Sequence, residues 1–212
     1  MPILQQKPVT PSGRFFLKNK VDLSTKRPER ALTKCVHRKK GRNAYGRITS
    51  RRRGGGHKRL YRQIDFRREQ IDQPSKVIAL EYDPNRTAHL ALLEFEDGTK
   101  TYILAPSSVS VGDTLLSSNQ KIDFKPGNAL PLNLIPLGTK VHCVEMLPGA
   151  GAKLARSAGC EVRLISVDGN HASLKMPSGE IRLVKETCRA TIGSVGNSAN
   201  QKSTIGKAGR NR

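Results

Sequence analysis

The first half of the chain's central region contains short stretches of strand length that either alternate between apolar and polar residues or are continuously apolar. These stretches are Val77–Asp83, His89–Phe95 and Thr101–Ala105, followed by a shorter one at Thr114–Leu116. Strong turn signals separate them, because the sequence reads Asp-Pro-Asn-Arg at 83–86, Glu-Asp-Gly at 96–98 and Val-Gly-Asp at 111–113. The pattern predicts four or five short antiparallel strands, enough to form a small barrel.

A second set of strand-length stretches follows. It consists of Lys140–Leu147, Glu161–Val167, Ala172–Met176, Glu180–Val184 and Arg189–Ile192. Asp-Gly-Asn at 168–170 and Pro-Ser-Gly at 177–179 supply turns between them. No convincing amphipathic helix longer than about ten residues is present anywhere. We therefore predict an all-β protein that consists of two small barrels with basic extensions.

Two segments interrupt this pattern. Residues 117–138 contain Pro126, Pro131 and Pro136, which predicts a linker or an ordered loop between the barrels. Residues 148–159 are rich in Gly and Ala but include Lys153 and Arg156. A small-residue loop with two cations could lie flat against a nucleic-acid backbone, and the alternative is a plain flexible hairpin loop.

The charge is distributed very unevenly along the 212 residues, whose formal net charge is +21. Residues 1–70 hold 21 Lys and Arg against 4 acidic residues, residues 71–198 hold 13 of each, and residues 199–212 hold 4 cations and no acid. Basic ends repel themselves and bury little apolar surface, so alone they should be extended and a polyanion could order them. This balance favours nucleic acid as the partner, although a solvated tail kept for solubility is the simpler alternative.

The most basic stretch, residues 41–59, interleaves arginine with glycine. Its cations are Arg42, Arg47, Arg51, Arg52, Arg53, Lys58 and Arg59. Arginine presents a planar fork of donors that matches phosphate oxygens, and glycine lets the backbone approach a phosphate closely. Tyr45, His57 and Tyr61 could stack on unpaired bases, which favours RNA over duplex DNA. The stretch lacks the spacing of a nucleotide-binding P-loop.

Other classes of site find little support in the sequence. Cys35, Cys143, Cys160 and Cys188 are scattered without a C-x-x-C pair, which favours isolated buried thiols and a reducing compartment over disulfides or zinc. His37 and His57 lie among cations, and His89 and His171 begin predicted strands. No nucleophile elbow and no clear carboxylate cluster is present. We therefore expect no enzyme, cofactor or metal, and the alternatives are an RNA-processing enzyme or a general nucleic-acid-binding architectural protein.

Targeting signals are also lacking. No window approaches the roughly 18 consecutive apolar residues of a membrane span. The N-terminus has no apolar run or cleavage site typical of a secretory signal. We therefore expect no membrane partner and no small-molecule substrate.

Several longer motifs resemble one known family over nearly the whole chain. They include GRNAYGRITSRRRGGGHKRLYRQIDFRRE, EYDPNRTAHLALLEFEDGTKTYILAP, PGAGAKLARSAG, CRATIGSVGN and IGKAGR. The chain resembles the bacterial-type large-subunit ribosomal protein L-two family. The resemblance implies an oligonucleotide-binding-fold barrel followed by an SH3-like barrel. It also implies binding to 23S-type large-subunit rRNA, subunit assembly and association, a position near the peptidyl transferase region, and a bacterial cytoplasmic or an organellar ribosome.

The resemblance also implies which residues bind rRNA. Arg86 in the DPNR turn, Arg156 in the LARSAG motif and the Arg67–Arg68 pair match family arginines that contact rRNA. The complete predicted rRNA-binding set consists of Arg42, Arg47, Arg51, Arg52, Arg53, His57, Lys58, Arg59, Arg62, Arg67, Arg68, Arg86, Lys153, Arg156, Lys207 and Arg210. The implied partners are rRNA, other ribosomal proteins and the small subunit.

The resemblance has two departures. Family members continue past IGKAGR into a basic extension with an H-P-H-G-G-G stretch, which this sequence does not contain before its last residue at 212. The PGAGAK loop also differs from relatives that have a Gly-Gly pair. We expect a basic arm at 1–40, an oligonucleotide-binding domain at 41–118, an SH3-like domain at 119–198 and a basic segment, truncated relative to the family, at 199–212.

Overall fold

The computed structural model describes residues 3–36 and 39–211, and in this part of the chain β-structure dominates, which confirms the predicted all-β class. The only α-helix among the described residues is the single turn α1 (Pro11–Arg14). Short 3-10 turns complete the helical content at Arg30–Leu32, Leu132–Leu134, Ser198–Lys202 and Ala208–Asn211. None of these helices is long and apolar enough to cross a membrane.

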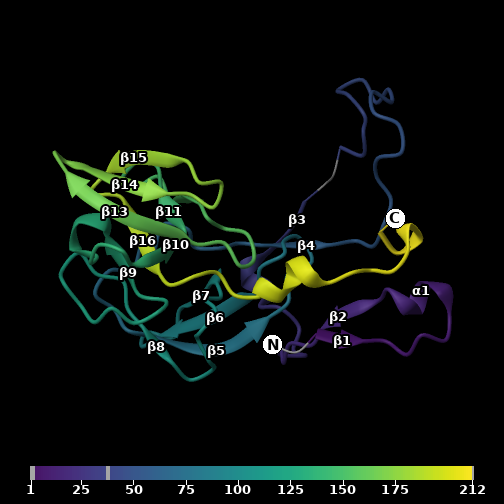
Figure 1. The fold of residues 1–212 in the computed structure, drawn as a ribbon, viewed down its shortest axis with the longest axis horizontal. Helices are drawn as coiled ribbons and strands as arrows, with labels where there is room; N and C mark the ends of the chain where they lie inside the picture. Colours follow the sequence, from purple (N-terminus) through teal and green to yellow (C-terminus); the bar gives the residue numbers. More distant parts are fainter. Residues whose placement is uncertain (1–2, 37–38, 212) are drawn as a thin grey trace.

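A four-stranded antiparallel sheet in the order β7-β6-β5-β8 forms the first barrel (Figure 1). Its strands are β5 (Ser75–Glu81), β6 (Leu90–Phe95), β7 (Lys100–Leu104) and β8 (Thr114–Leu115). β6 is almost entirely apolar because both faces of the sheet are covered. Leu93 packs in one core cluster, and Leu90 packs in a second cluster with Tyr102. The predicted strands are confirmed to within two residues at either end.

A six-stranded antiparallel sheet forms the second barrel in the order β15-β14-β13-β10-β16-β9. Its strands are β9 (Ala129–Pro131), β10 (Lys140–His142), β13 (Val162–Asp168), β14 (His171–Lys175), β15 (Ile181–Lys185) and β16 (Arg189–Ile192). Alternate positions point inward, so Val162, Leu164, Leu174 and Val184 are buried in one core. The domain limits at 41–118 and 119–198 remain a prediction.

Three sequence expectations about local structure need correction. Residues 117–138 are more than a linker, because they contribute β9, which pairs with β16 and forms one edge of the six-stranded sheet. The predicted strand at 140–147 breaks at Cys143, whose φ of 50° ends β10 before β11 (Val144–Glu145) begins. The loop at 148–159 contains β12 (Ala152–Leu154), which pairs with β11.

The terminal segments lie side by side along the right of Figure 1. β1 (Ile3–Gln5) and β2 (Leu17–Asn19) form a hairpin, and Leu17 also forms a bridge with Thr204 near the C-terminus. The backbone N–H of Glu29 donates to the Tyr102 hydroxyl at 2.9 Å, which ties the arm to the first barrel. β3 (Thr33–Cys35) pairs with β4 (Leu60–Arg62) at the base of the chain's longest projection.

The cysteines are free among the described residues, and their exposure differs. Cys188 is buried, Cys143 and Cys160 are half-buried, and Cys35 is exposed, so the expectation of buried thiols is wrong for Cys35. No group of three or more potential metal ligands occurs in residues 3–36 and 39–211. His37, which we had placed in the basic arm, lies outside the described residues.

Candidate nucleic-acid interface

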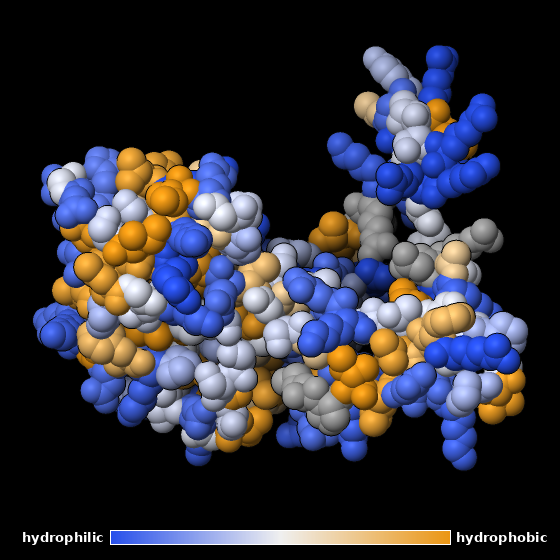
Figure 2. All heavy atoms as spheres, in the orientation of Figure 1, coloured by the Kyte–Doolittle hydropathy of each residue, from blue (hydrophilic) through white to orange (hydrophobic). Residues whose placement is uncertain are grey.

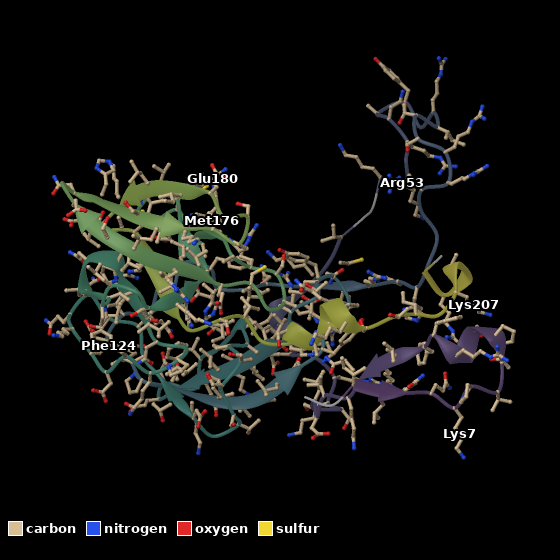
Figure 3. All side chains as sticks on the ribbon, in the orientation of Figure 1. Lys7, Arg53, Phe124, Met176, Glu180 and Lys207 are labelled. Carbon is tan, nitrogen blue, oxygen red and sulfur yellow. The ribbon has the colours of Figure 1, made fainter. Side chains whose placement is uncertain are left out.

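The arginine loop, residues 39–59, projects away from both barrels (Figure 1). Figure 2 shows it as a strongly hydrophilic knob, and Figure 3 shows its side chains spread outward around Arg53. Every residue from 42 to 60 is exposed. The loop therefore presents all seven of its predicted RNA-binding cations, together with His57 and Tyr45, to solvent.

Backbone hydrogen bonds give this loop a defined shape without using its arginine side chains. The Gly41 carbonyl accepts from the N–H groups of Thr49 and Ser50 at 2.9 and 3.1 Å. The Asn43 side chain accepts from the N–H groups of Tyr45 and Arg47, both at 3.0 Å. Gly41 has a φ of 72°, and a Cβ there would lie 2.3 Å from the Ser50 carbonyl oxygen, so this position requires glycine. None of these bonds uses a guanidinium group of the loop.

The turn at 83–86 holds two arginines through one buried carboxylate. Asp83 is fully buried, and its Oδ2 accepts from Arg86 Nε at 2.6 Å, while Oδ1 lies 4.0 Å from Arg62 NH1. The Arg86 guanidinium also lies over the Tyr61 ring, 6.0 Å from its centroid. Arg59 NH1 donates to the Pro84 carbonyl at 2.6 Å, which joins the end of the arginine loop to this turn.

A groove between the barrels collects three further predicted residues. Arg67, Lys153 and Arg156 line it and are exposed. Arg156 lies over the Phe66 ring at 5.0 Å from the centroid. The small-residue loop at 148–159 is therefore no plain flexible hairpin, because β12 and Glu145 hold it. The buried Glu145 carboxylate accepts from the N–H groups of Gly149 at 3.1 Å and Gly151 at 2.9 Å.

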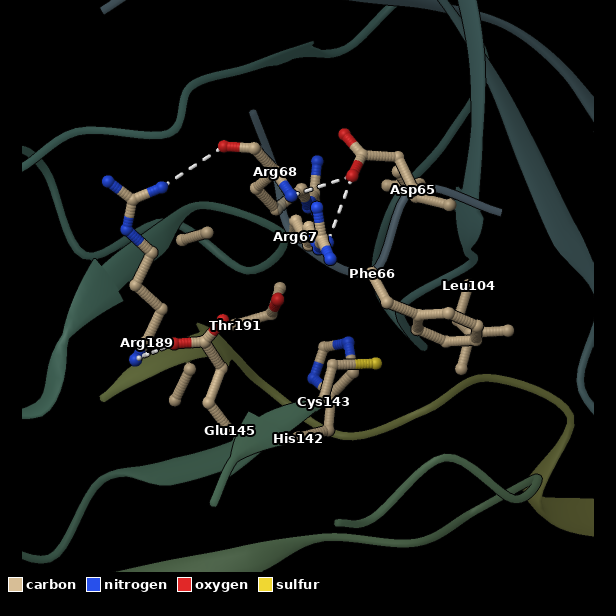
Figure 4. A pocket seen from close by; sticks show the side chains of 13 residues that line it. Asp65, Phe66, Arg67, Arg68, Leu104, His142, Cys143, Glu145, Arg189 and Thr191 are labelled. Atoms are coloured by element: carbon tan, nitrogen blue, oxygen red, sulfur yellow. Dashed lines mark hydrogen bonds between the residues drawn. The ribbon is translucent and has the colours of Figure 1, made fainter. Parts of the chain in front are cut away.

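Arg68 is more buried than its neighbour Arg67, which is exposed. An Asx turn at Asp65, whose Oδ1 accepts from the N–H groups of both arginines, sets the two side chains apart. Arg68 NH2 donates to the Gly127 carbonyl at 3.1 Å, and its own carbonyl accepts from Arg189 NH1 at 3.1 Å (Figure 4). Burial lowers the pKa of the Arg68 guanidinium, an effect that nearby Asp65 opposes. Arg68 therefore joins the two barrels.

The same buried contact contains His142 and Cys143 (Figure 4). Burial lowers the pKa of His142 to about 4, and its Nδ1 lies 2.9 Å from the Gly193 carbonyl oxygen. Burial also raises the pKa of Cys143 to about 12, so its thiol stays protonated at neutral pH. Neither group is suited to act as a nucleophile or as a base near pH 7.

The depressed pKa of His142 predicts a pH-dependent stability. The unfolded chain binds a proton near pH 6.5 and the folded chain only near pH 4, so acid favours unfolding between these values. We expect the free energy of unfolding to decrease by about 3 kcal/mol, because of His142, as the pH falls from 6.5 to 4. In denaturant unfolding, His142→Asn should not show this loss of unfolding free energy. His171→Asn, which changes an exposed histidine, is the control. Parallel pH curves for wild type and His142→Asn would contradict it.

The C-terminal cations lie beside the N-terminal hairpin. Lys207 is exposed (Figure 3), and Arg210 lies over the Phe16 ring at 4.5 Å from the centroid. Arg210 NH1 also donates to the Ile205 carbonyl at 2.7 Å. Both residues are presented on a surface that the two chain ends build together.

The structure thus distributes the predicted residues over five places: the arginine loop, the Asp83 turn, the groove at Arg156, the chain ends and, for Arg68 alone, the contact between the barrels. Sequence reasoning missed the acids that hold the arginines, namely Asp65, Asp83 and Glu145. The turn positions of Asp65 and Asp83 carried a local signal, since aspartate there accepts backbone N–H bonds. Glu145 carried none, because its partners include Arg189 N–H, which is 44 residues away.

Comparison with known proteins gives two family matches and a close relative. The model of "Ribosomal Proteins L2, RNA binding N-terminal domain" matches residues 29–117, and that of "Ribosomal Proteins L2, C-terminal domain" matches residues 125–212. The chain is also similar to "Large ribosomal subunit protein uL2" of Opitutus terrae, with 54% identity over 215 residues. That match covers 100% of this chain and 75% of the relative.

Proposed function

The chain belongs to the uL2 family of large-subunit ribosomal proteins, and we propose that it serves the subunit by binding large-subunit rRNA. As a family member it is a structural constituent of the large subunit. We further propose that rRNA binding supports subunit assembly, association with the small subunit and the peptidyl transferase region. No catalytic step is assigned to it.

The arginine loop carries this proposal. Its cations are exposed, its shape is set by backbone and Asn43 bonds, and no carboxylate side chain occurs between residues 39 and 59 to neutralise it. A preformed cluster of unneutralised arginines binds a polyanion at a small conformational cost, since the backbone is already ordered. Exposed aromatic Tyr45 suits stacking on an unpaired base.

We propose two roles among the predicted residues. Direct phosphate contacts come from the arginine loop, Arg67, Lys153, Arg156 and Lys207, whose side chains are exposed. Arg62 and Arg68 act as positioning residues, because one is buried against Asp83 and the other bonds to Gly127 across the barrels. Arg86 combines both roles, since its guanidinium is mostly covered but remains 19% exposed.

Binding to a large-subunit rRNA fragment tests the proposal. With about 8 phosphates neutralised, the log–log dependence of affinity on salt has a slope of roughly −6 to −7. Two comparisons accompany this measurement. One is binding to duplex DNA of equal length, and the other is incubation of the RNA with the protein and Mg²⁺ to detect turnover. Preference for the DNA would favour a general architectural protein, turnover of the RNA would favour an enzyme, and either result would overturn the proposal.

Arg156 provides the sharpest single-residue prediction for this function. Arg156→Ala should weaken binding to the rRNA fragment by about 1–3 kcal/mol, because an exposed guanidinium on the Phe66 ring is oriented toward the groove. Arg156→Lys keeps the charge but loses the planar fork, so only part of the affinity should return. Filter binding measures the loss, circular dichroism checks the fold, and an unchanged affinity of Arg156→Ala would exclude this contact.

A further inference from the structure

The two chain ends and the first barrel border a second, open cavity, distinct from the groove at Arg156. Its volume is about 570 Å³. Three segments line it: the N-terminal arm between Phe16 and Leu23, the turn between β5 and β6, and the stretch between Asn197 and Ile205. In Figure 1 these segments meet where the yellow C-terminal stretch passes β2 and β5. A cavity of this size accommodates a small organic ligand.

Three of the seven unpaired buried side-chain atoms among the described residues belong to two residues that line this cavity. Both ring nitrogens of His89 and the Oδ1 of Asn19 are buried and have no partner within hydrogen-bond geometry among the described residues, although the Asn197 side chain lies near enough to His89 to influence its pKa. Asn19 uses its other side-chain atom, Nδ2, to donate to Asn197 Oδ1 at 2.6 Å. Buried polar atoms without partners destabilise a protein, so a cluster of them calls for a ligand or ordered water that supplies the missing bonds.

The lining also contains an aromatic platform and cations. Tyr82 lines the cavity, is 60% exposed and lies 6.5 Å from the His89 ring between centroids. Lys18 is exposed on the wall, and Arg86 lines the same cavity. Burial lowers the pKa of His89, an effect the neighbouring Asn197 side chain opposes, so its imidazole favours the neutral form with one donor and one acceptor.

These groups together match the chemistry of a nucleotide. A nucleobase has a flat face for Tyr82 and an edge of donors and acceptors for Asn19 and His89, while its phosphate suits Lys18 and Arg86. We propose that this cavity binds a single unpaired nucleotide of the RNA, with its base inside and its phosphate at the cationic rim. This inference rests on the proposed rRNA binding and adds a specific base-binding site to it.

Because these polar atoms are unpaired, one substitution should change nucleotide affinity and stability in different directions. His89→Leu removes two unsatisfied nitrogens and keeps an apolar side chain, so its unfolding midpoint should equal or exceed that of the wild type. Its affinity for nucleotides should nevertheless fall. A histidine that served only the fold would give the opposite result, with stability lost and binding unchanged.

The experiment uses the full chain and the four 5′-mononucleotides, observed through the ring nitrogen NMR signals of His89. We expect at least one nucleotide to shift these signals, and Tyr82→Ala or His89→Leu to weaken its affinity by about tenfold or more. Inorganic phosphate should not produce the shift. Phe124→Ala removes an aromatic residue that does not line the cavity, and it should bind as the wild type does.

A second arm measures the rRNA fragment with the same variants. Weaker RNA binding by Tyr82→Ala, together with competition by the mononucleotide, supports the proposal. No signal change at about 10 mM nucleotide, which excludes even a weak site, would overturn it. An equal shift with phosphate alone would overturn it, as would RNA affinities unaffected by Tyr82→Ala and His89→Leu. A wild-type chain that fails to bind the fragment would instead overturn the proposed function itself.

Discussion

We expect replacement of Arg42, Arg47, Arg51, Arg52 and Arg53 by Ala to lower affinity for the large-subunit rRNA fragment on the order of 10³-fold at about 0.1 M salt. Each lost phosphate contact removes roughly one released counterion, so the slope of the salt dependence should become shallower by about 4. The loop should keep its shape, because the Gly41 carbonyl and Asn43 side chain hold it through backbone N–H groups. Filter binding across a salt series gives both quantities.

A control with the same change in net charge distinguishes this site from general attraction. Five exposed cations of the second half of the chain can be replaced by Ala together: Lys121, Arg163, Lys175, Arg182 and Lys185. We expect this variant to lose far less affinity, since these cations are spread over a region that is neutral overall. Equal losses in the two variants would mean that bulk charge, and not the arginine loop, drives binding.

The second large effect concerns stability. Asp83→Ala should lower the free energy of unfolding by about 3–5 kcal/mol, because it removes a fully buried carboxylate and leaves two largely covered guanidinium groups without their partner. Arg86→Ala leaves the Asp83 carboxylate with Asn85 as a hydrogen-bond partner and with Arg62, 4.0 Å away, as its ion-pair partner, so it should also destabilise the chain. Because of this buried ion pair, we do not expect Arg86→Ala to change RNA binding without also changing stability. Denaturant unfolding measures both variants.

Asp97 provides the matched control for this prediction. It is also a turn aspartate that accepts a backbone N–H, from Thr99 at 3.1 Å, but it is exposed and pairs with no arginine of residues 3–36 and 39–211. We expect Asp97→Ala to cost about 0.5–1 kcal/mol, the value of a single exposed hydrogen bond. Asp83→Asn keeps the bond to the Asn85 N–H but removes the charge and replaces the Oδ2 acceptor of Arg86 by an amide donor, so it separates the turn hydrogen bond from the ion pair. Similar losses for Asp83→Ala and Asp97→Ala would show that the buried ion pairs contribute little.

Local patterns in the sequence were sufficient to predict most of the strands. Alternation at 77–83 and turn residues at 83–86 and 96–98 identify β5, β6 and β7, because side chains of a strand alternate between its faces wherever the strand pairs. The break at Cys143 and the strand β9 escaped prediction. Cys143 has an ordinary side chain with a left-handed backbone, and β9 is a three-residue strand whose pairing with β16 depends on residues about 60 positions later.

The candidate site, like the strands, could be predicted from the sequence only in part. The sequence located the arginine loop, since exposure of a Gly-rich, Arg-rich stretch follows from its composition. It could not separate Arg67 from Arg68, which are adjacent in sequence yet point to the groove and to the contact between the barrels. That difference arises from the positive φ of Arg68, 54°, and from the position of Gly127 on the other barrel.

The sequence by itself determined the charge of the two ends, the all-β class and the family, because these depend on composition, on periodicity two and on motifs of contiguous residues. Only the tertiary structure decided which acids hold which arginines and that Asn19, His89 and Asn197 line one cavity. Asn19 and Asn197 are separated by 178 positions, and no local preference encodes a contact over that distance. Such contacts are fixed by strand register and by the packing of the ends against the first barrel.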